Sequence, residues 1–213
     1  QFPDTKWKFN NLGKGWVLGE TLITGIGQGY TLTTPIQLCL MTAQIANGGY
    51  KIQPKILTDD NQLTSEQVKK AMEDSKSNDF YEPLYDDQKN IRIIQEAMFS
   101  STNEIMGTSY KSRIDDPKYQ FAGKTGTAQV KRISKREREL DLKTFQIPYE
   151  ERDHALYVAY GPYTNPRYAL SIIVEHGGSG STAAAPMATK LFKLIVDRHE
   201  YRKQLPEYKD FSI

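Results

Sequence analysis

The heptapeptide AGKTGTA, residues 122–128, lies within a stretch from Phe121 to Val130 that has the residue types of a β-strand. A charged insertion at 131–153 follows it. We therefore predict a strand over residues 121–130. Side chains alternate between the two faces of a strand, so Thr125 and Thr127 are expected to face the same way.

The tripeptide Gly-Lys-Thr at 123–125 also ends the phosphate-binding loop of many nucleotide-hydrolysing enzymes. That loop needs a glycine five positions before Gly123, where this sequence has Lys118. It also needs a helix directly afterwards, whereas Gly126 and the β-prone residues 127–130 follow here. Both observations argue against a nucleotide-hydrolysing enzyme.

Lys-Thr-Gly on a strand is the third element of active-site serine enzymes that act on β-lactams and D-Ala-D-Ala peptides. Two adjacent hydroxyls, on Thr125 and Thr127, are able to hold a carboxylate, and the charge of Lys124 strengthens such hydrogen bonds. Gly126 lets a substrate backbone lie against the strand, and the N–H beyond it can point at a developing oxyanion. An ordinary strand with a surface lysine matches the tripeptide equally well, so this motif alone leaves both interpretations open.

The residues before the strand are expected to be mostly helical. Thr34-Pro35-Ile36-Gln37 has the pattern of a capped helix start, and Asn47-Gly48-Gly49 ends that helix. The helix carries no charge, so we expect it to be buried on most sides. A short helix at 64–72 and a longer one at 87–99 follow, and residues 107–119 read as an irregular polar segment.

The residues after the insertion predict a hairpin and a closing helix. Residues 155–160 and 168–175 are β-rich and flank a turn at 161–166, which indicates antiparallel pairing. Ser181 or Thr182 caps a helix that continues to about residue 202. Its apolar stripe lies on Ala184, Ala188, Leu191 and Ile195, joined by Met187, Leu194 and Val196. Helices, then three strands, then a helix predict an α+β fold, an antiparallel sheet flanked by helices.

The composition excludes several classes of protein. The chain has 213 residues and a net charge of +2, which argues against nucleic acid as a partner. The single Cys39 and three scattered histidines predict neither a disulfide nor a metal site. We expect structural hydrogen bonding from His154 and His176. Residues 21–50 are uncharged but rich in Gly, Thr and Gln, so they do not read as a membrane span. The pattern of the insertion favours a solvated, mobile connection over the alternative, a patch that binds a membrane surface or a partner.

Several further motifs occur in a fixed order around the Lys-Thr-Gly element: Ile26-Gly27-Gln28-Gly29-Tyr30, Thr34 to Leu38, Ala46 to Gly49, Gly107-Thr108, Gly123 to Gln129, Arg152-Asp153-His154, and Glu175 to Gly180 leading into Ala184-Ala185-Pro186. On these motifs the chain resembles the transpeptidase domain of class B penicillin-binding proteins, above all the elongation-type penicillin-binding protein 2 branch. The resemblance runs from Trp16 to about Val196. It implies one transpeptidase-domain portion over 1–213, with a mostly helical part at 1–120, strands at 121–175 and a C-terminal helix at 181–202.

The resemblance implies a peptidoglycan D,D-transpeptidase that cross-links stem peptides through an acyl-serine intermediate and needs no cofactor or metal. It implies that Lys124 and Thr125 bind the substrate carboxylate and support proton transfer, that Gly126 permits close approach, and that Thr127 gives a hydroxyl and an oxyanion-hole N–H. The implied partners are stem peptides, β-lactam antibiotics and a membrane glycosyltransferase of the elongation machinery. The implied location is the periplasmic face of the bacterial inner membrane.

The sequence departs from this family at the nucleophile. The family's serine lies in a Ser-x-x-Lys element, and no serine of this sequence has a lysine three positions later. Ser101-Thr102-Asn103 matches the family's Ser-x-Asn element in letters, but it comes after the Ile26–Tyr30 motif instead of before it. We therefore expect a C-terminal portion of the domain that is inactive alone. The alternative is a non-catalytic module of the same fold that binds peptidoglycan or a protein partner.

Overall fold

The structure, a computed structural model, describes residues 3–54, 82–85, 87–131, 139–140 and 142–204. The helix predicted at 64–72 and much of the first part of the charged insertion lie outside these ranges. The chain divides into two units, residues 1–37 and residues 38–213, and each is described by itself.

The first unit contains two short helices, α1 (Thr5–Leu12) and α2 (Leu18–Gly25). The Asp4 side chain accepts a hydrogen bond from the Trp7 N–H and so caps α1. The buried ammonium of Lys8 forms an ion pair with Glu20 and also donates to the Gly15 carbonyl. A single charged contact therefore ties the two helices together.

Helix α3 (Pro35–Ala46) begins and ends as the sequence predicts. Thr34 and Gln37 exchange backbone and side-chain hydrogen bonds in a capping box, and Gly48 and Gly49 have left-handed φ angles of 93° and 92°. The expected burial on most sides is wrong, since only Thr42 is buried and Ile36 is 62% exposed. An uncharged helix tolerates burial, but burial requires a surface that covers it.

The sheet has three antiparallel strands, β1 (Ala122–Ala128), β2 (His154–Gly161) and β3 (Tyr168–Val174), in the order β1-β2-β3. The predicted strand and the predicted hairpin are both confirmed. Thr125 lies opposite Tyr157, and Lys124 lies opposite Val158. Among the described residues β1 has a strand partner on one side only, so it forms an edge of the sheet.

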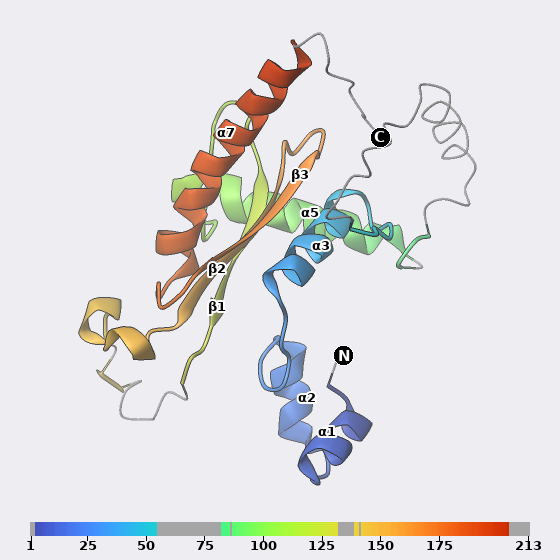
Figure 1. Cartoon of the computed structure of the whole chain (residues 1–213), viewed down its shortest axis with the longest axis vertical. Helices are drawn as coiled ribbons and strands as arrows, with labels where there is room; N and C mark the ends of the chain where they lie inside the picture. Colours follow the sequence, from blue (N-terminus) through green and yellow to red (C-terminus); the bar gives the residue numbers. More distant parts are fainter. Residues whose placement is uncertain (1–2, 55–81, 86, 132–138, 141, 205–213) are drawn as a thin grey trace. The chain divides into compact units, whose positions relative to one another are not determined.

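Helices pack on both faces of the sheet, as Figure 1 shows for α5 (Gln88–Asn103) and α7 (Ala185–Lys203). Ala155, Tyr157 and Ala159 point to one face, where they join a core with Ala185, Ala188 and Phe192 of α7. The alternate residues Val158 and Tyr160 pack on the other face against Met98 and Phe99 of α5. The α+β fold predicted from the sequence, an antiparallel sheet flanked by helices, is confirmed.

The closing helix begins differently from the prediction and buries a partly different stripe. Ser179 precedes a π-helical turn, Gly180–Ala184, and α7 follows it without a break. Ala184, Ala188 and Val196 are buried as predicted, but Leu191 is 40% exposed, and Phe192, which the prediction leaves out, is buried in its place. Leu191 and Phe192 lie three and four residues after Ala188, and either spacing fits the period of a helix. Phe192 lies inside because its ring stacks on Phe121, with 4.8 Å between the ring centroids.

Replacing Phe192 by alanine should lower the free energy of unfolding by about 3–5 kcal/mol, because it leaves a cavity beside Phe121. Leu194→Ala, on the same helix at a side chain that is 67% exposed, should change it by less than about 0.5 kcal/mol. Urea unfolding of the two variants measures this difference. Equal losses would place the packed face of α7 elsewhere.

Candidate active site

The Lys-Thr-Gly element lies on the edge strand β1, where the side chain of Lys124 is exposed and that of Thr125 is half-buried. Thr125 and Thr127 lie opposite Tyr157 and Ala155, which are two residues apart on β2. The two hydroxyl-bearing residues therefore share one face, as the sequence predicts. The Lys124 ammonium donates to the Thr125 carbonyl at 2.9 Å, so it remains next to the threonine.

Gly126 lies directly against another part of the chain. A Cβ atom added at Gly180 would come within 2.7 Å of the Gly126 carbonyl oxygen and 2.4 Å of the Leu156 carbonyl oxygen. The start of the π-helical turn therefore touches the backbone of β1 and β2 at the tripeptide. Gly180 has to be glycine here, because any side chain would push the turn away from the strand.

A buried cluster of hydroxyl groups lies under the first residues of β1. The Tyr157 hydroxyl lies 3.0 Å from Thr102 Oγ1 and 3.0 Å from Ser109 Oγ, and these two oxygens are 3.3 Å apart. A Cβ at Gly123 would come within 2.4 Å of the Tyr157 hydroxyl oxygen, so glycine is required at this point of the strand. The hydroxyl cluster joins β2, α5 and the segment after α5.

A second row of hydroxyls runs parallel to the buried one and ends at the tripeptide. Ser101 Oγ lies 3.2 Å from Thr108 Oγ1, which lies 3.2 Å from Thr125 Oγ1. Ser101 and Thr108 each precede a member of the buried cluster, Thr102 and Ser109. Consecutive residues thus divide between a buried and an exposed row.

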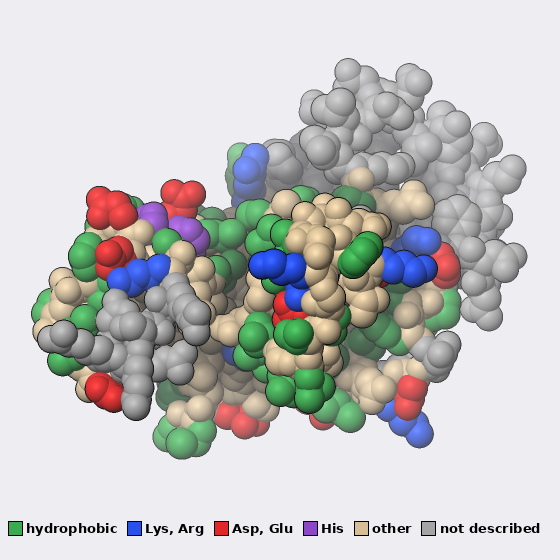
Figure 2. Space-filling model, turned by 90° about the horizontal axis from the view of Figure 1, so that it is seen from below, with side chains coloured by type: hydrophobic (Ala, Val, Ile, Leu, Met, Phe, Trp, Pro, Cys, Tyr) green, Lys and Arg blue, Asp and Glu red, His purple; other side chains and the backbone are tan. Residues whose placement is uncertain are grey.

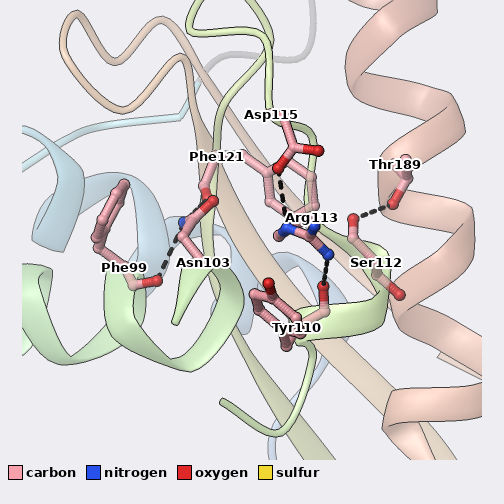
Figure 3. A network of polar contacts seen from close by, with 8 residues as sticks. All are labelled: Phe99, Asn103, Tyr110, Ser112, Arg113, Asp115, Phe121 and Thr189. Carbon is pink, nitrogen blue, oxygen red and sulfur yellow. Dashed lines mark hydrogen bonds and ion pairs between the residues drawn. The ribbon is translucent and has the colours of Figure 1, made fainter. Parts of the chain in front are cut away.

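The segment between α5 and β1 is held at several points along its length, as Figure 3 shows. The Asn103 amide donates to the Phe99 and Phe121 carbonyls, both at 3.0 Å. Arg113 pairs with Asp115, and Thr189 of α7 donates to the Ser112 carbonyl. The predicted irregular segment therefore has a fixed course, with one short 3-10 helix at Tyr110–Ser112.

The Ser101-Thr102-Asn103 triplet forms the last turn of α5, which extends four residues beyond its predicted end at Phe99. Thr102 is buried in the hydroxyl cluster, and the Asn103 amide N–H₂ is used on two backbone carbonyls. These contacts give the second and third residues of the triplet structural roles. Ser101 leads, through Thr108, to the side chain of Thr125.

The two histidines join the ends of β2 and β3. The His176 N–H donates to His154 Nδ1 at 2.9 Å, and the two rings meet edge to face with centroids 4.7 Å apart. His176 has a left-handed φ of 54°. Figure 2 shows histidine side chains gathered on one face beside acidic and basic groups. Both residues therefore take part in structural hydrogen bonding, as the sequence predicts.

In the part of the chain that the structure describes, no three His, Cys, Asp or Glu side chains converge as metal ligands would. Within the same ranges, every helix is too short or too polar to cross a bilayer.

Comparison with known proteins identifies the family to which this fold belongs. A family model described as the penicillin-binding protein transpeptidase domain matches residues 3–193. The chain belongs to this family. The peptidoglycan D,D-transpeptidase MrdA of Haemophilus influenzae is 31% identical over 221 residues, which cover 99% of this chain and 32% of that protein. The same-named protein of Acinetobacter baumannii is 35% identical over 191 residues, covering 87% of this chain and 26% of that protein.

Solved structures of the family have the same fold. The Helicobacter pylori penicillin-binding protein PBP2, in complex with MreC, superimposes with a TM-score of 0.68 at 30% identity, over 93% of this chain and 31% of that one. Pseudomonas aeruginosa PBP2, in complex with WCK 5153, gives 0.63 at 32% identity, over 91% and 37%. The resemblance to the PBP2 branch is confirmed. The chain spans about a third of the length of the curated relatives that it matches.

The residues of β1 can be identified from the sequence, whereas the hydroxyl rows behind them cannot. Gly107-Thr108 stood out only as part of the family pattern, and the segment that contains it carried no other signal than its polarity. The contacts of Thr108 join residues 7 and 17 positions apart in the chain. A local pattern of residue types does not encode contacts of that range.

Two buried tyrosines should make the fold less stable at alkaline pH. Burial raises the pKa of Tyr157, although hydrogen bonds to Ser109 and Thr102 oppose the shift, and burial also raises the pKa of Tyr160. The folded state keeps both protons where the unfolded chain loses them, near pH 10. The contribution of these two tyrosines to the free energy of unfolding should be constant below that pH and fall above it, by up to about 1.4 kcal/mol per pH unit for each tyrosine.

Tyr160→Phe separates this effect from other alkaline effects. The Tyr160 hydroxyl is buried without a hydrogen-bond partner among the described residues, so its removal should cost little stability at pH 7. Urea unfolding at pH 8 and pH 11 should show a smaller loss between the two pH values in the variant than in the unaltered protein. Equal losses would contradict the role given to this tyrosine.

Proposed function

We propose that the protein containing this chain is a peptidoglycan D,D-transpeptidase and that β1 binds the C-terminal carboxylate of the stem peptide. The observation that carries the proposal is the position of Lys124, Thr125 and Thr127 on an edge strand within a penicillin-binding protein transpeptidase fold. A cation beside two hydroxyls on one short strand offers charge-assisted hydrogen bonds to a carboxylate. MrdA proteins, to which the chain is similar, carry this activity in their name.

Each residue of the tripeptide has a role in this proposal. Lys124 supplies the positive charge and supports proton transfer, and its present bond to a backbone carbonyl leaves it exposed enough to turn toward a ligand. Thr125 and Thr127 donate their hydroxyl protons to the carboxylate. Gly126 keeps the strand surface free of a side chain. As a residue of an edge strand, Thr127 is also suited to offer its N–H to an oxyanion.

The reaction proposed is acyl transfer through a serine ester. The serine oxygen of a Ser-x-x-Lys element, which this sequence does not contain, attacks the carbonyl of the penultimate D-Ala, and its proton passes to the departing terminal D-Ala. The amine of a neighbouring stem peptide then attacks the ester, loses a proton and restores the serine hydroxyl. A β-lactam acylates the same serine, and its ring-opened product stays attached.

The remaining proposals concern location and partners. We place the protein at the periplasmic face of the bacterial inner membrane, where stem peptides and β-lactams reach it. A membrane glycosyltransferase of the elongation machinery is the proposed protein partner, by resemblance to elongation-type enzymes. The complex of Helicobacter pylori PBP2 with MreC supports a protein partner of some kind for proteins of this branch.

The 213-residue chain alone should not be labelled covalently by a fluorescent penicillin, because it lacks a Ser-x-x-Lys element. Denaturing gel electrophoresis after incubation with the penicillin tests this. A fluorescent band at 24.3 kDa that survives boiling would show that another nucleophile is present.

In a protein that joins this chain to a Ser-x-x-Lys element, Lys124→Ala should lower the acylation rate at least about tenfold, the effect of losing one charge-assisted hydrogen bond. Stopped-flow measurement with a fluorescent penicillin gives the rate constant. Lys111→Ala, at a basic residue in the segment after α5, is the matched control and should leave the rate unchanged. An unchanged rate for Lys124→Ala would refute its role. Absence of acylation in the unaltered protein would favour the non-catalytic binding module.

A further inference from the structure

The exposed row of hydroxyls gives Thr125 a partner that no sequence motif assigns to it. Ser101 stands on the last turn of α5, Thr108 in the segment that follows, and Thr125 on β1. The two oxygen–oxygen distances along the row are 3.2 Å each, and in each pair either oxygen can be the donor. The row therefore has two possible directions of donation.

A carboxylate at β1 selects one of these directions. A hydroxyl has a single proton, and an ionised carboxylate can only accept. If Thr125 donates to Thr108, it has no proton left for the ligand. If Ser101 donates to Thr108 and Thr108 donates to Thr125, the Thr125 proton is free to point at the carboxylate. Hydrogen bonds in such a row also polarise one another, which strengthens the last donor.

We propose that Thr108 is a positioning residue for carboxylate recognition. Its hydroxyl donates to Thr125 Oγ1 and thereby directs the Thr125 proton to the carboxylate of a D-Ala-D-Ala peptide or a β-lactam. Ser101 donates to Thr108 and fixes its direction. This inference rests on the proposed function, in which Thr125 binds that carboxylate.

The backbone around Thr108 is fixed well enough for this task. The Ser109 N–H and the Ser109 hydroxyl both donate to the Ser101 carbonyl at 3.0 Å. A Cβ at Gly107 would lie 2.3 Å from the same carbonyl oxygen, so only glycine lets the segment approach α5 so closely. Buried bonds through Ser109 thus hold the residue next to Thr108 against α5.

The exposure of Thr108 argues for a role in binding more than in stability. The hydrogen bonds of Thr108 are exposed to solvent, where water can replace them. Such a bond adds little to the stability of the folded chain. The adjacent buried cluster of Thr102, Ser109 and Tyr157 already joins the same elements.

The test uses the protein that joins this chain to a Ser-x-x-Lys element, and two ligands, benzylpenicillin and its methyl ester, which lacks the negative charge. Thr108→Val keeps the shape of the side chain and removes the hydroxyl. It should lower the acylation rate constant for benzylpenicillin about five- to tenfold, the effect of about one hydrogen bond, and change the rate for the ester by less than about twofold. Thr108→Ser, which keeps the hydroxyl, should restore the rate.

Further variants distinguish positioning from a structural effect. In a Thr125→Val background, Thr108→Val should have no additional effect, because Thr108 acts through Thr125. Ser101→Ala should lower the benzylpenicillin rate in the same direction as Thr108→Val, which provides a second test if Thr108→Val does not fold. Ser100→Ala is the matched control, since the Ser100 hydroxyl bonds to Glu104 outside the row.

The outcomes separate the two proposals. An unchanged benzylpenicillin rate in Thr108→Val, an equal loss for both ligands, or full additivity with Thr125→Val each overturns the role of Thr108 and leaves the proposed function standing. Unaltered protein that no penicillin acylates overturns the proposed function itself, and the positioning role with it.

Discussion

The hydroxyl of Tyr157 is the contact on which the arrangement of this fold depends. It stands on the central strand, and it bonds to Thr102 of α5 and to Ser109 in the segment that follows. Removing any one of these three hydroxyls would take a buried hydrogen bond from each of the other two, and a buried polar group that loses a bond cannot replace it with water. Gly123 makes room for the tyrosine, so the strand that bears the Lys-Thr-Gly element cannot move independently of α5. The position of β1 is therefore fixed by the buried hydroxyl cluster behind the strand.

Neighbouring residues of the two hydroxyl rows differ in burial and in their contacts. Thr102 and Ser109 are buried and hold the backbone, whereas Ser101 and Thr108 lie nearer the solvent and lead to Thr125. In the role proposed for it, the exposed row would serve recognition while the buried row maintains the fold. This difference also explains why the segment after α5 is irregular and yet well defined: its course is fixed by side chains, by Asn103 on one end and by Thr189 of α7 on the other.

The sequence predicted the elements whose signals are local. The strand at 121–130 and the hairpin follow from alternation and turn residues, and they are present within a few residues of their expected bounds. The end of α5 was placed too early, because Ser100 to Asn103 favour helices poorly. Contacts of Thr102 with Gly123 of β1 and Tyr157 of β2 stabilise that last turn. The exposure of α3 and the burial of Phe192 depend on which surface covers a helix, and a helical period alone does not tell one side from the other. The residues of β1 are identifiable from their types, whereas the contact between Thr108 and Thr125 is visible only in the structure.

The edge position of β1 also bears on how copies of this chain behave toward one another. An open strand edge offers unpaired backbone groups to the strand of another molecule, and proteins prevent such pairing by placing charge and irregularity there. On β1 the exposed Lys124 provides the charge, and Gly126 weakens the preference of the strand for continued pairing. The features suited to receiving a substrate backbone are thus the same ones that discourage sheet-to-sheet association. The open edge of β1 therefore carries a positive charge that opposes its pairing with the same strand of another copy.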